Sequence, residues 1–148
     1  DVAFVQGMVP HHEQAIQMSE LVIANGDDPT VIALAEQINA AQGPEIDQMN
    51  TWLDDWDIDP AGSDGMDGMD GANGMMSDDE MDMMSEAMGA DLDRMFLETM
   101  IRHHQGAIRM AEVELEEGSN ADVLALAQGI IDGQQAEIDQ MQSMLEDT

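Results

Sequence analysis

The sequence predicts an all-α protein, a four-helix bundle made of two repeated helical hairpins. Three observations support this fold class. Apolar residues recur every three or four positions along four long segments, glycines and helix-capping residues separate these segments, and the second half of the chain repeats the first. A long connection rich in Met, Asp and Gly joins the two hairpins, and we expect it to contain one short helix.

The first two helices should form the first hairpin. One is expected to run from about Val2 to Asn25, with a bend at Pro10 and with Gly26 as a left-handed cap. The other begins with Asp28 as N-cap, followed by a proline in the first helical position. The Gly-Pro pair at 43–44 should kink this second helix.

The connection changes character along its length. From Asp59 to Met76 it has neither a helical nor a strand period and contains many glycines, so we expect this stretch to be flexible. Ser77 to Glu80 then spells S-D-D-E, the pattern of a capping box. A short helix should start there, and we expect Gly89 to close it.

The second hairpin should mirror the first. A third long helix is expected from about Leu92 to Glu117, ended by Gly118, and Asn120 should cap a fourth that runs to the end of the chain.

The halves repeat at a constant shift of 92 positions, the separation of His11 from His103, and no gap is needed. The identical residues include Asp1, Phe4, Met8, Gly26, Gln42 and the run EIDQM from Glu45 to Met49. We therefore expect one domain over 1–148, with the first repeat at 1–53, the connection at 54–90 and the second repeat at 93–145.

All the histidines of the chain lie in two doublets at equivalent places in the repeat: His11, His12, His103 and His104. Helical spacing puts each doublet beside the apolar stripe of its helix. Adjacent residues differ by about 100° around a helix, so both imidazoles of a doublet border the stripe without pointing the same way. Either one imidazole binds a ligand while its neighbour supports it, or each serves a different site.

Composition excludes several functional classes. The net charge of −30 comes from 33 acidic residues against three arginines and no lysine, a surface that repels nucleic acid and anionic lipid. Such a surface suits a salt-rich or cation-rich setting. Cysteine is absent, which excludes disulfides and thiolate metal sites, and no segment is long and apolar enough for membrane insertion.

The repeated pattern F-x3-M-[VI]-x-HH-x2-AI-x-M, followed by a glycine-ended helix and Q-x2-EIDQM-x3-L, resembles family 305 of the domains of unknown function. That family is grouped with ferritin-like bundles, and the resemblance covers most of the chain. Its CopM-like members imply an extracytoplasmic copper-binding protein linked to metal tolerance. The ligand set implied by the resemblance is Met8, His11, His12, Met18, Met49, Met100, His103, His104, Met110 and Met141.

The donor chemistry points to the same metal. Thioether sulfur is a soft ligand that favours monovalent copper or silver, and imidazole accepts either oxidation state of copper. We therefore expect Cu(I) as the preferred ion, with Cu(II) as the second. The methionines of the connection, Met66, Met69, Met75 and Met76, have no apolar partners in sequence, so we expect a mobile arm that captures soft metal.

These observations lead us to expect a copper buffer or carrier, not an enzyme. It should be secreted or lie in the periplasm or cell envelope, with upstream residues such as a signal peptide removed, and should exchange copper with a delivering or accepting protein. The main alternative is a metal-free structural or partner-binding acidic bundle, in which the methionines only fill the core. A di-metal oxidase is a weak rival, because the residues three positions before the histidines are Met8, Val9, Met100 and Ile101, not glutamate.

Overall fold

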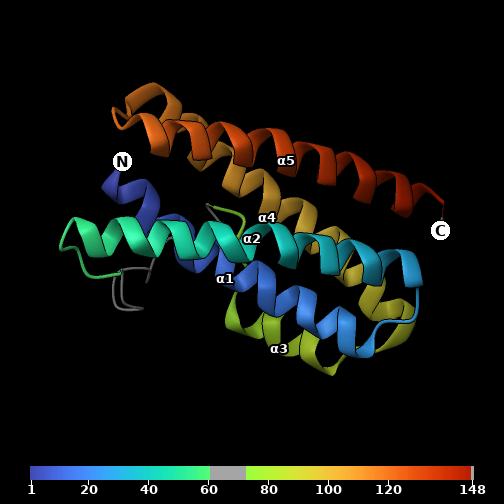
Figure 1. Ribbon diagram of the computed structural model, residues 1–148. Helices are drawn as coiled ribbons and strands as arrows, with labels where there is room; N and C mark the ends of the chain where they lie inside the picture. Colours follow the sequence, from blue (N-terminus) through green and yellow to red (C-terminus); the bar gives the residue numbers. More distant parts are fainter. Residues whose placement is uncertain (61–72, 148) are drawn as a thin grey trace.

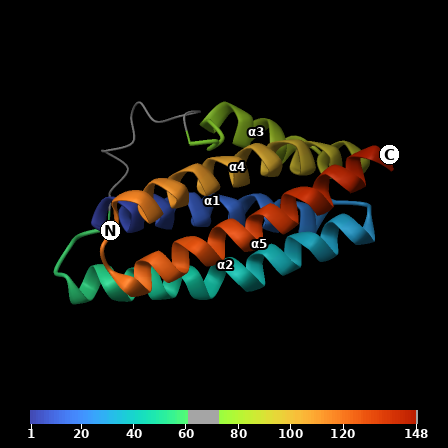
Figure 2. The ribbon, with the colours of Figure 1, turned by 90° about the horizontal axis from the view of Figure 1, so that it is seen from above.

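The computed structural model describes residues 1–60 and 73–147, and all the regular structure in these ranges is helical. Four long helices form the bundle: α1 (Val2–Asn25), α2 (Pro29–Asp55), α4 (Gly89–Glu117) and α5 (Ala121–Glu146) (Figure 1). The short helix α3 (Asp78–Glu86) lies against α1 and α4, on the outer side of α4 in Figure 2. The predicted all-α bundle is therefore confirmed.

The helices pack as two hairpins that meet along one pair. α1 packs on α2, α4 packs on α5, and the most extensive contact between the hairpins is that of α1 with α4. Each half of the repeat thus contributes its first helix to the centre of the molecule. None of the helices in the described ranges combines the length and the apolar character that a membrane crossing would need.

Two clusters of buried side chains form the core, and each draws on both hairpins. One cluster contains Met8 and Val9 of α1 together with Met49 of α2 and Ala107 of α4. The other contains Met18 of α1 and, from the second hairpin, the following residues: Leu92, Phe96, Leu97, Met100, Ile138 and Met141. Burying one such side chain contributes about 1.5–3 kcal/mol relative to leaving it exposed, so the two clusters hold the hairpins together.

Local sequence sets the helix starts as expected. The Asp28 side chain accepts a hydrogen bond from the Thr30 backbone N–H, and the Asn120 side chain accepts from the backbone N–H groups of the next turn. Ser77 and Glu80 form a reciprocal capping box at the start of α3. All three predicted caps are confirmed. Each accepts hydrogen bonds from backbone N–H groups that the helix itself leaves unpaired.

Two glycine predictions were wrong. Gly26 is extended, with φ −71°, instead of left-handed, since the turn after it is organised by the other hairpin: the Asp93 carboxylate accepts from the backbone N–H groups of Asp27 and Asp28. A Cβ at Gly26 would collide with that carboxylate. Gly89 does adopt φ +59°, but it begins α4 instead of closing α3, which ends three residues earlier at Glu86.

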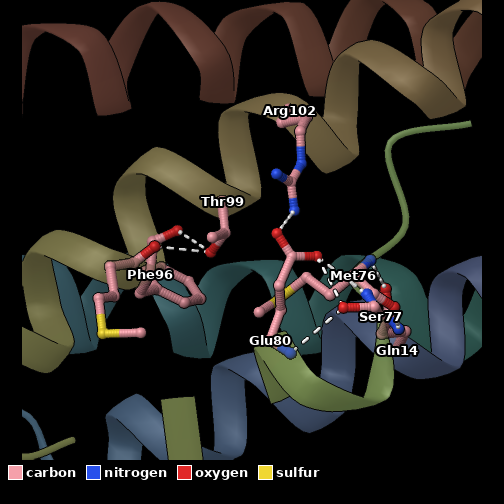
Figure 3. A network of polar contacts seen from close by, with 8 residues as sticks. Gln14, Met76, Ser77, Glu80, Phe96, Thr99 and Arg102 are labelled. Atoms are coloured by element: carbon pink, nitrogen blue, oxygen red, sulfur yellow. Dashed lines mark hydrogen bonds and ion pairs between the residues drawn. The ribbon is translucent and has the colours of Figure 1, made fainter. Parts of the chain in front are cut away.

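The end of the connection is ordered, contrary to expectation. Gln14 of α1 holds Met76 at both backbone groups: its Nε2 donates to the Met76 carbonyl over 2.9 Å and its Oε1 accepts from the Met76 N–H over 2.8 Å (Figure 3). The Met76 side chain is buried in the core cluster that includes Met100. Met76 therefore finds in the folded core the apolar partners that its neighbours in sequence do not provide. Residues 61–72 of the expected arm, with Met66 and Met69, lie outside the described residues.

A salt bridge continues this attachment. Arg102 of α4 donates from Nη2 to Oε1 of Glu80 over 2.8 Å, and Glu80 also closes the capping box of α3 (Figure 3). The hydrogen bond from the Ser77 backbone N–H, together with Arg102, lowers the pKa of Glu80. The segment from Asn73 to Glu80 is therefore fastened to both central helices.

Candidate metal centre

The two histidine doublets meet in the middle of the bundle, between the two core clusters. On α1 the doublet lies between Met8, which belongs to one core cluster, and Ala15, which belongs to the other. On α4 the doublet lies between Met100, in the same cluster as Ala15, and Ala107, in the same cluster as Met8. We call His11, His12, His103 and His104 the histidine layer. Their exposed fractions are 1% or less, so the layer is out of contact with bulk water.

Within a doublet the imidazoles do point in different directions. His11 and His103 face each other across the contact between α1 and α4, with ring centroids 3.7 Å apart and ring planes inclined by 35°. His12 and His104 turn instead toward the second helix of their own hairpin. The doublets therefore converge through one imidazole each, and the other imidazole has a separate environment.

Two glutamates orient the outer imidazoles in the same way. Nε2 of His12 lies 2.6 Å from Oε2 of Glu45 on α2, and Nε2 of His104 lies 2.6 Å from Oε2 of Glu137 on α5. An ionised carboxylate only accepts hydrogen bonds, so the imidazole Nε2 carries the proton in each pair. Both pairs join residues 33 positions apart, which makes them equivalent in the repeat.

The central imidazoles differ from each other. Nε2 of His11 donates to the backbone carbonyl of Asn73 over 2.9 Å, which brings the ordered end of the connection to the histidine layer. Two glycines allow this approach: Gly74 has φ +77°, and a Cβ at Gly106 would overlap the Asn73 carbonyl. The His103 ring lies tilted against His11, and neither of its ring nitrogens has a hydrogen-bond partner among the described residues.

In the part of the chain that the structure describes, every histidine has at least one ring nitrogen without a hydrogen-bond partner. Among the described residues, Nδ1 of all four histidines is buried and has no hydrogen-bond partner. A buried nitrogen without a partner costs about 1–3 kcal/mol, so four of them at the centre of one bundle require an explanation. In the three imidazoles whose Nε2 is the donor, a neutral ring leaves Nδ1 with a lone pair, the form that binds metal.

Burial also keeps the central imidazoles neutral. It lowers the pKa of His11 to about 3, partly offset by the hydrogen bond to the Asn73 carbonyl and reinforced by the neighbouring histidines. Burial likewise lowers the pKa of His103 well below its usual value, and the nearby charges of the other imidazoles act in the same direction. At neutral pH both rings can therefore offer a lone pair without first losing a proton.

The methionines of the expected ligand set lie on both sides of the histidine layer. Met8 and Met49 belong to one core cluster, and Met18, Met100 and Met141 to the other, all fully buried. Met110 is half-buried beside the first of these clusters. The fold thus brings thioethers from all four long helices into the core on either side of the imidazoles.

Sequence reasoning missed three groups that hold the imidazoles: Glu45, Glu137 and the Asn73 carbonyl. A signal for the glutamates was present, because Gln42, Glu45 and Met49 are spaced three and four residues apart on the buried face of α2, and the repeat retains all three. No pattern in the sequence identifies Asn73, since the position of its backbone carbonyl depends only on the path that the chain takes across the bundle.

Acidic and imidazole side chains alone do not form a metal centre here. In residues 1–60 and 73–147, no group of three or more His, Cys, Asp or Glu side chains is arranged to hold a metal ion. A metal ion in the histidine layer would therefore need thioether ligands beside the imidazoles. That donor set favours a soft ion over iron, manganese or zinc.

Comparison with known proteins shows similarity to one family along most of the chain. A model of the family described as domain of unknown function (DUF305) matches residues 1–145. A DUF305 protein from Streptomyces coelicolor has a similar structure, with a TM-score of 0.88 and 32% identity, covering 97% of this chain and 90% of that one. CopM in its Cu(I)-bound form has a TM-score of 0.83 and 31% identity, covering 99% of this chain and 96% of that one.

CopM has also been solved with Ag and with Cu(II) bound. A shorter match, to the uncharacterized protein L153 of Acanthamoeba polyphaga mimivirus, is 40% identical over 55 residues. That match spans 37% of this chain and 36% of the viral protein, so it covers about a third of each.

Proposed function

The chain belongs to the DUF305 family, and we propose that it binds copper in the histidine layer and acts as a copper buffer or carrier. The observation that carries this proposal is the set of four buried Nδ1 atoms without hydrogen-bond partners. Binding one soft metal ion, or more than one, would satisfy these atoms at the place where the two repeats meet.

The hydrogen bonds around the layer support this role. Histidines that bind metal through one ring nitrogen commonly donate the other N–H to a carboxylate or a backbone carbonyl, which fixes the tautomer and makes the ligand more basic. Glu45, Glu137 and the Asn73 carbonyl occupy these positions for His12, His104 and His11. Their arrangement leaves Nδ1 as the ligand atom in each case.

The oxidation state follows from the donor types. Thioethers and neutral imidazoles suit Cu(I) and Ag(I), and the absence of cysteine leaves sulfur donation to methionine. We propose Met8, Met18, Met49, Met100, Met110 and Met141 as thioether ligands shared between the two sides of the layer. Cu(II) is the second candidate, and CopM, a similar protein, binds both copper states and silver.

A carrier of this kind would work outside the cytoplasm, and one protein of similar structure is described as a candidate secreted protein. We propose that the chain receives copper from, or passes it to, another copper-binding protein. Neutral ligands suit exchange, because they hold the ion without the strong charge attraction of a thiolate site.

The direct test is titration with Cu(I) under a competing chelator in the absence of oxygen. The wild-type protein should withdraw copper from the chelator, and the pairs H11A/H103A and H12A/H104A should each bind more weakly, with circular dichroism reporting that the helices persist. M83S, which removes a thioether exposed to solvent, serves as the control and should bind like wild type. Equal binding by all four proteins would exclude the histidine layer as the site.

The thioethers need a test that separates ligand from core filler. M8L/M100L keeps side-chain volume close to that of methionine, so stability should change by less than about 1.5 kcal/mol, while Cu(I) affinity should fall. M84L removes a buried thioether outside the proposed ligand set and should leave affinity unchanged. If M8L/M100L binds copper as tightly as wild type, these two methionines only fill the core.

A further inference from the structure

A small cavity opens between α2 and α5. These two helices lie on the opposite side of the bundle from α3 (Figure 2). It has a volume of about 40 Å³, and both hairpins line it with equivalent residues of the repeat: Gln42 and Gln134, Glu45 and Glu137, Ala41 and Gly133. The cavity therefore lies on the approximate twofold axis that relates the halves. The Glu45 side chain is about a quarter exposed, at 27%, so solvent reaches the cavity.

Two carboxylates face this cavity with no basic side chain on their own helices. Glu45 and Glu137 each use Oε2 to orient an imidazole. Neither α2 nor α5 contains a lysine, an arginine or a histidine. Two negative charges brought together at a place of restricted solvent access repel each other, and a cation between them would remove that repulsion.

Two amides in the cavity are buried without partners. Gln42 is 3% exposed and Gln134 5%, and Oε1 of both side chains has no hydrogen-bond partner among the described residues. Nε2 of Gln42 is unpartnered as well. Leaving a buried amide oxygen without a partner is unfavourable, yet both halves of the repeat place a glutamine here. Unpartnered amide oxygens and carboxylates thus belong to residues that line the same small cavity.

We propose that this cavity binds one hard divalent cation, held by oxygen atoms of Glu45, Glu137, Gln42 and Gln134. Carboxylate and amide oxygens are the ligands preferred by Mg²⁺, Ca²⁺ and Mn²⁺, and water completes the coordination of such ions in proteins. A volume of about 40 Å³ accommodates one ion with a water molecule and excludes organic ligands.

This cation site is distinct from the proposed copper site. Copper would bind the Nδ1 side of the imidazoles in the core, whereas the cation would bind on the far side of the glutamates that orient two of those imidazoles. The proposal rests on the cavity and its oxygen atoms, so it stands whether or not the histidine layer binds copper.

Mn²⁺ is a suitable probe, because its electron paramagnetic resonance signal reports free ion directly. The copper-free protein should be titrated in about 0.5 M KCl, where the Debye length is about 4 Å and weak binding to the acidic surface is screened. We expect one saturable Mn²⁺ ion per chain. Q42L/Q134L should lose this ion. The control Q48L/Q140L changes two exposed glutamines at equivalent positions of the same helices and should retain it.

Two readouts make the result specific. Bound Mn²⁺ should broaden the NMR signals of the His12 and His104 rings, which lie directly behind the carboxylates, and Q42L/Q134L should abolish this broadening. Cu(I) capacity should be the same in Q42L/Q134L as in wild type, which separates this proposal from the copper site. Identical Mn²⁺ binding by the wild type and both variants, or no saturable ion at all, would overturn the proposal and leave an adventitious ion only.

Discussion

Glu45 and Glu137 are the residues on which the orientation of the outer imidazoles depends. Each fixes the proton of its histidine on Nε2 and so leaves the buried Nδ1 with a lone pair. The histidines could be identified from sequence because four imidazoles in two matched doublets are unusual. The glutamates have a weaker signal in the sequence, their helical spacing from Gln42 and Met49 and its retention in the repeat, and their contacts with the histidines became evident only in the fold.

Neutralising these two carboxylates should weaken copper binding. In E45Q/E137Q the amide no longer acts as a charged acceptor for the imidazole N–H, so we expect Cu(I) affinity to fall by about 10–100-fold while the helices persist. The matched control is D47N/D139N, which removes the same charge from exposed, equivalent positions on the same helices. Chelator competition measures both variants; equal affinities would mean that the glutamates do not act on the metal ligands.

The buried imidazoles should make the copper-free protein sensitive to acid. His11 has a folded-state pKa of about 3 against 6.5 for an ordinary histidine, and the pKa of His103 is lowered in the same direction. Between these two pKa values, these histidines are protonated in the unfolded chain but not in the folded chain. The free energy of unfolding should therefore have its full value above pH 6.5. Below pH 6.5 it should fall, by up to about 1.4 kcal/mol per pH unit for each such histidine.

Urea unfolding at pH 7 and pH 5 would measure this effect, in high salt so that protonation of surface carboxylates contributes little. H11F/H103F, which removes the two titrating rings and keeps aromatic groups in their place, should show a shallower dependence on pH. A wild-type protein equally stable at both pH values would show that these imidazoles are not held neutral.

At the level of elements, the helices follow local sequence and the connection follows tertiary contacts. Apolar spacing and the caps at Asp28, Ser77 and Asn120 are enough to identify the helices from the amino-acid sequence alone. The conformations of Gly26 and Gly89 could not be predicted in the same way. Asp93, 67 residues after Gly26 in sequence, organises the turn after α1, and an ordered Met76 depends on Gln14 from another helix.

A methyl group at Gly106 should detach the end of the connection from the bundle. Alanine usually stabilises a helix by about 1 kcal/mol relative to glycine, but here its Cβ would overlap the Asn73 carbonyl. In the native protein the Met76 N–H donates a hydrogen bond to Gln14. We therefore expect G106A to accelerate exchange of this amide hydrogen and to lower the thermal midpoint of unfolding. Hydrogen exchange followed by NMR, with a melting curve, measures both changes.

Gly129 on α5 provides the matched control, because nothing lies within 4 Å of a Cβ placed there. G129A should raise the stability by about 0.5–1 kcal/mol and leave Met76 protected. If G106A behaved like G129A, the contact between Asn73 and α4 would have no energetic importance.

At the level of the whole molecule, the repeat and the charge dominate. The repeat led to the prediction of paired hairpins, and it underlies the approximate twofold arrangement of the His–Glu pairs and of the cavity between α2 and α5. The meeting of His11 with His103 could not be predicted, because the sequence leaves open which helices of the two hairpins touch. That choice is made by packing between α1 and α4.

The net charge of −30 should make stability depend on salt. Like charges repel in the compact state, and added salt screens them, so the thermal midpoint should rise as KCl increases to a few hundred millimolar, where the Debye length is about 5 Å. Differential scanning calorimetry of the copper-free protein measures this rise. Equal midpoints at low and high salt would show that repulsion between the surface charges reduces the stability of the folded state very little.

The central claim, that the histidine layer binds soft metal through Nδ1, is tested most directly by long-range ¹H–¹⁵N NMR of the imidazoles during titration with Ag(I). Before silver is added, the rings of His11, His12 and His104 should show protonated Nε2 and unprotonated Nδ1. We expect stoichiometric Ag(I) to shift the Nδ1 resonances while Nε2 keeps its proton. Imidazole resonances that do not change with silver, or metal-induced shifts at Nε2 in place of Nδ1, would contradict the account.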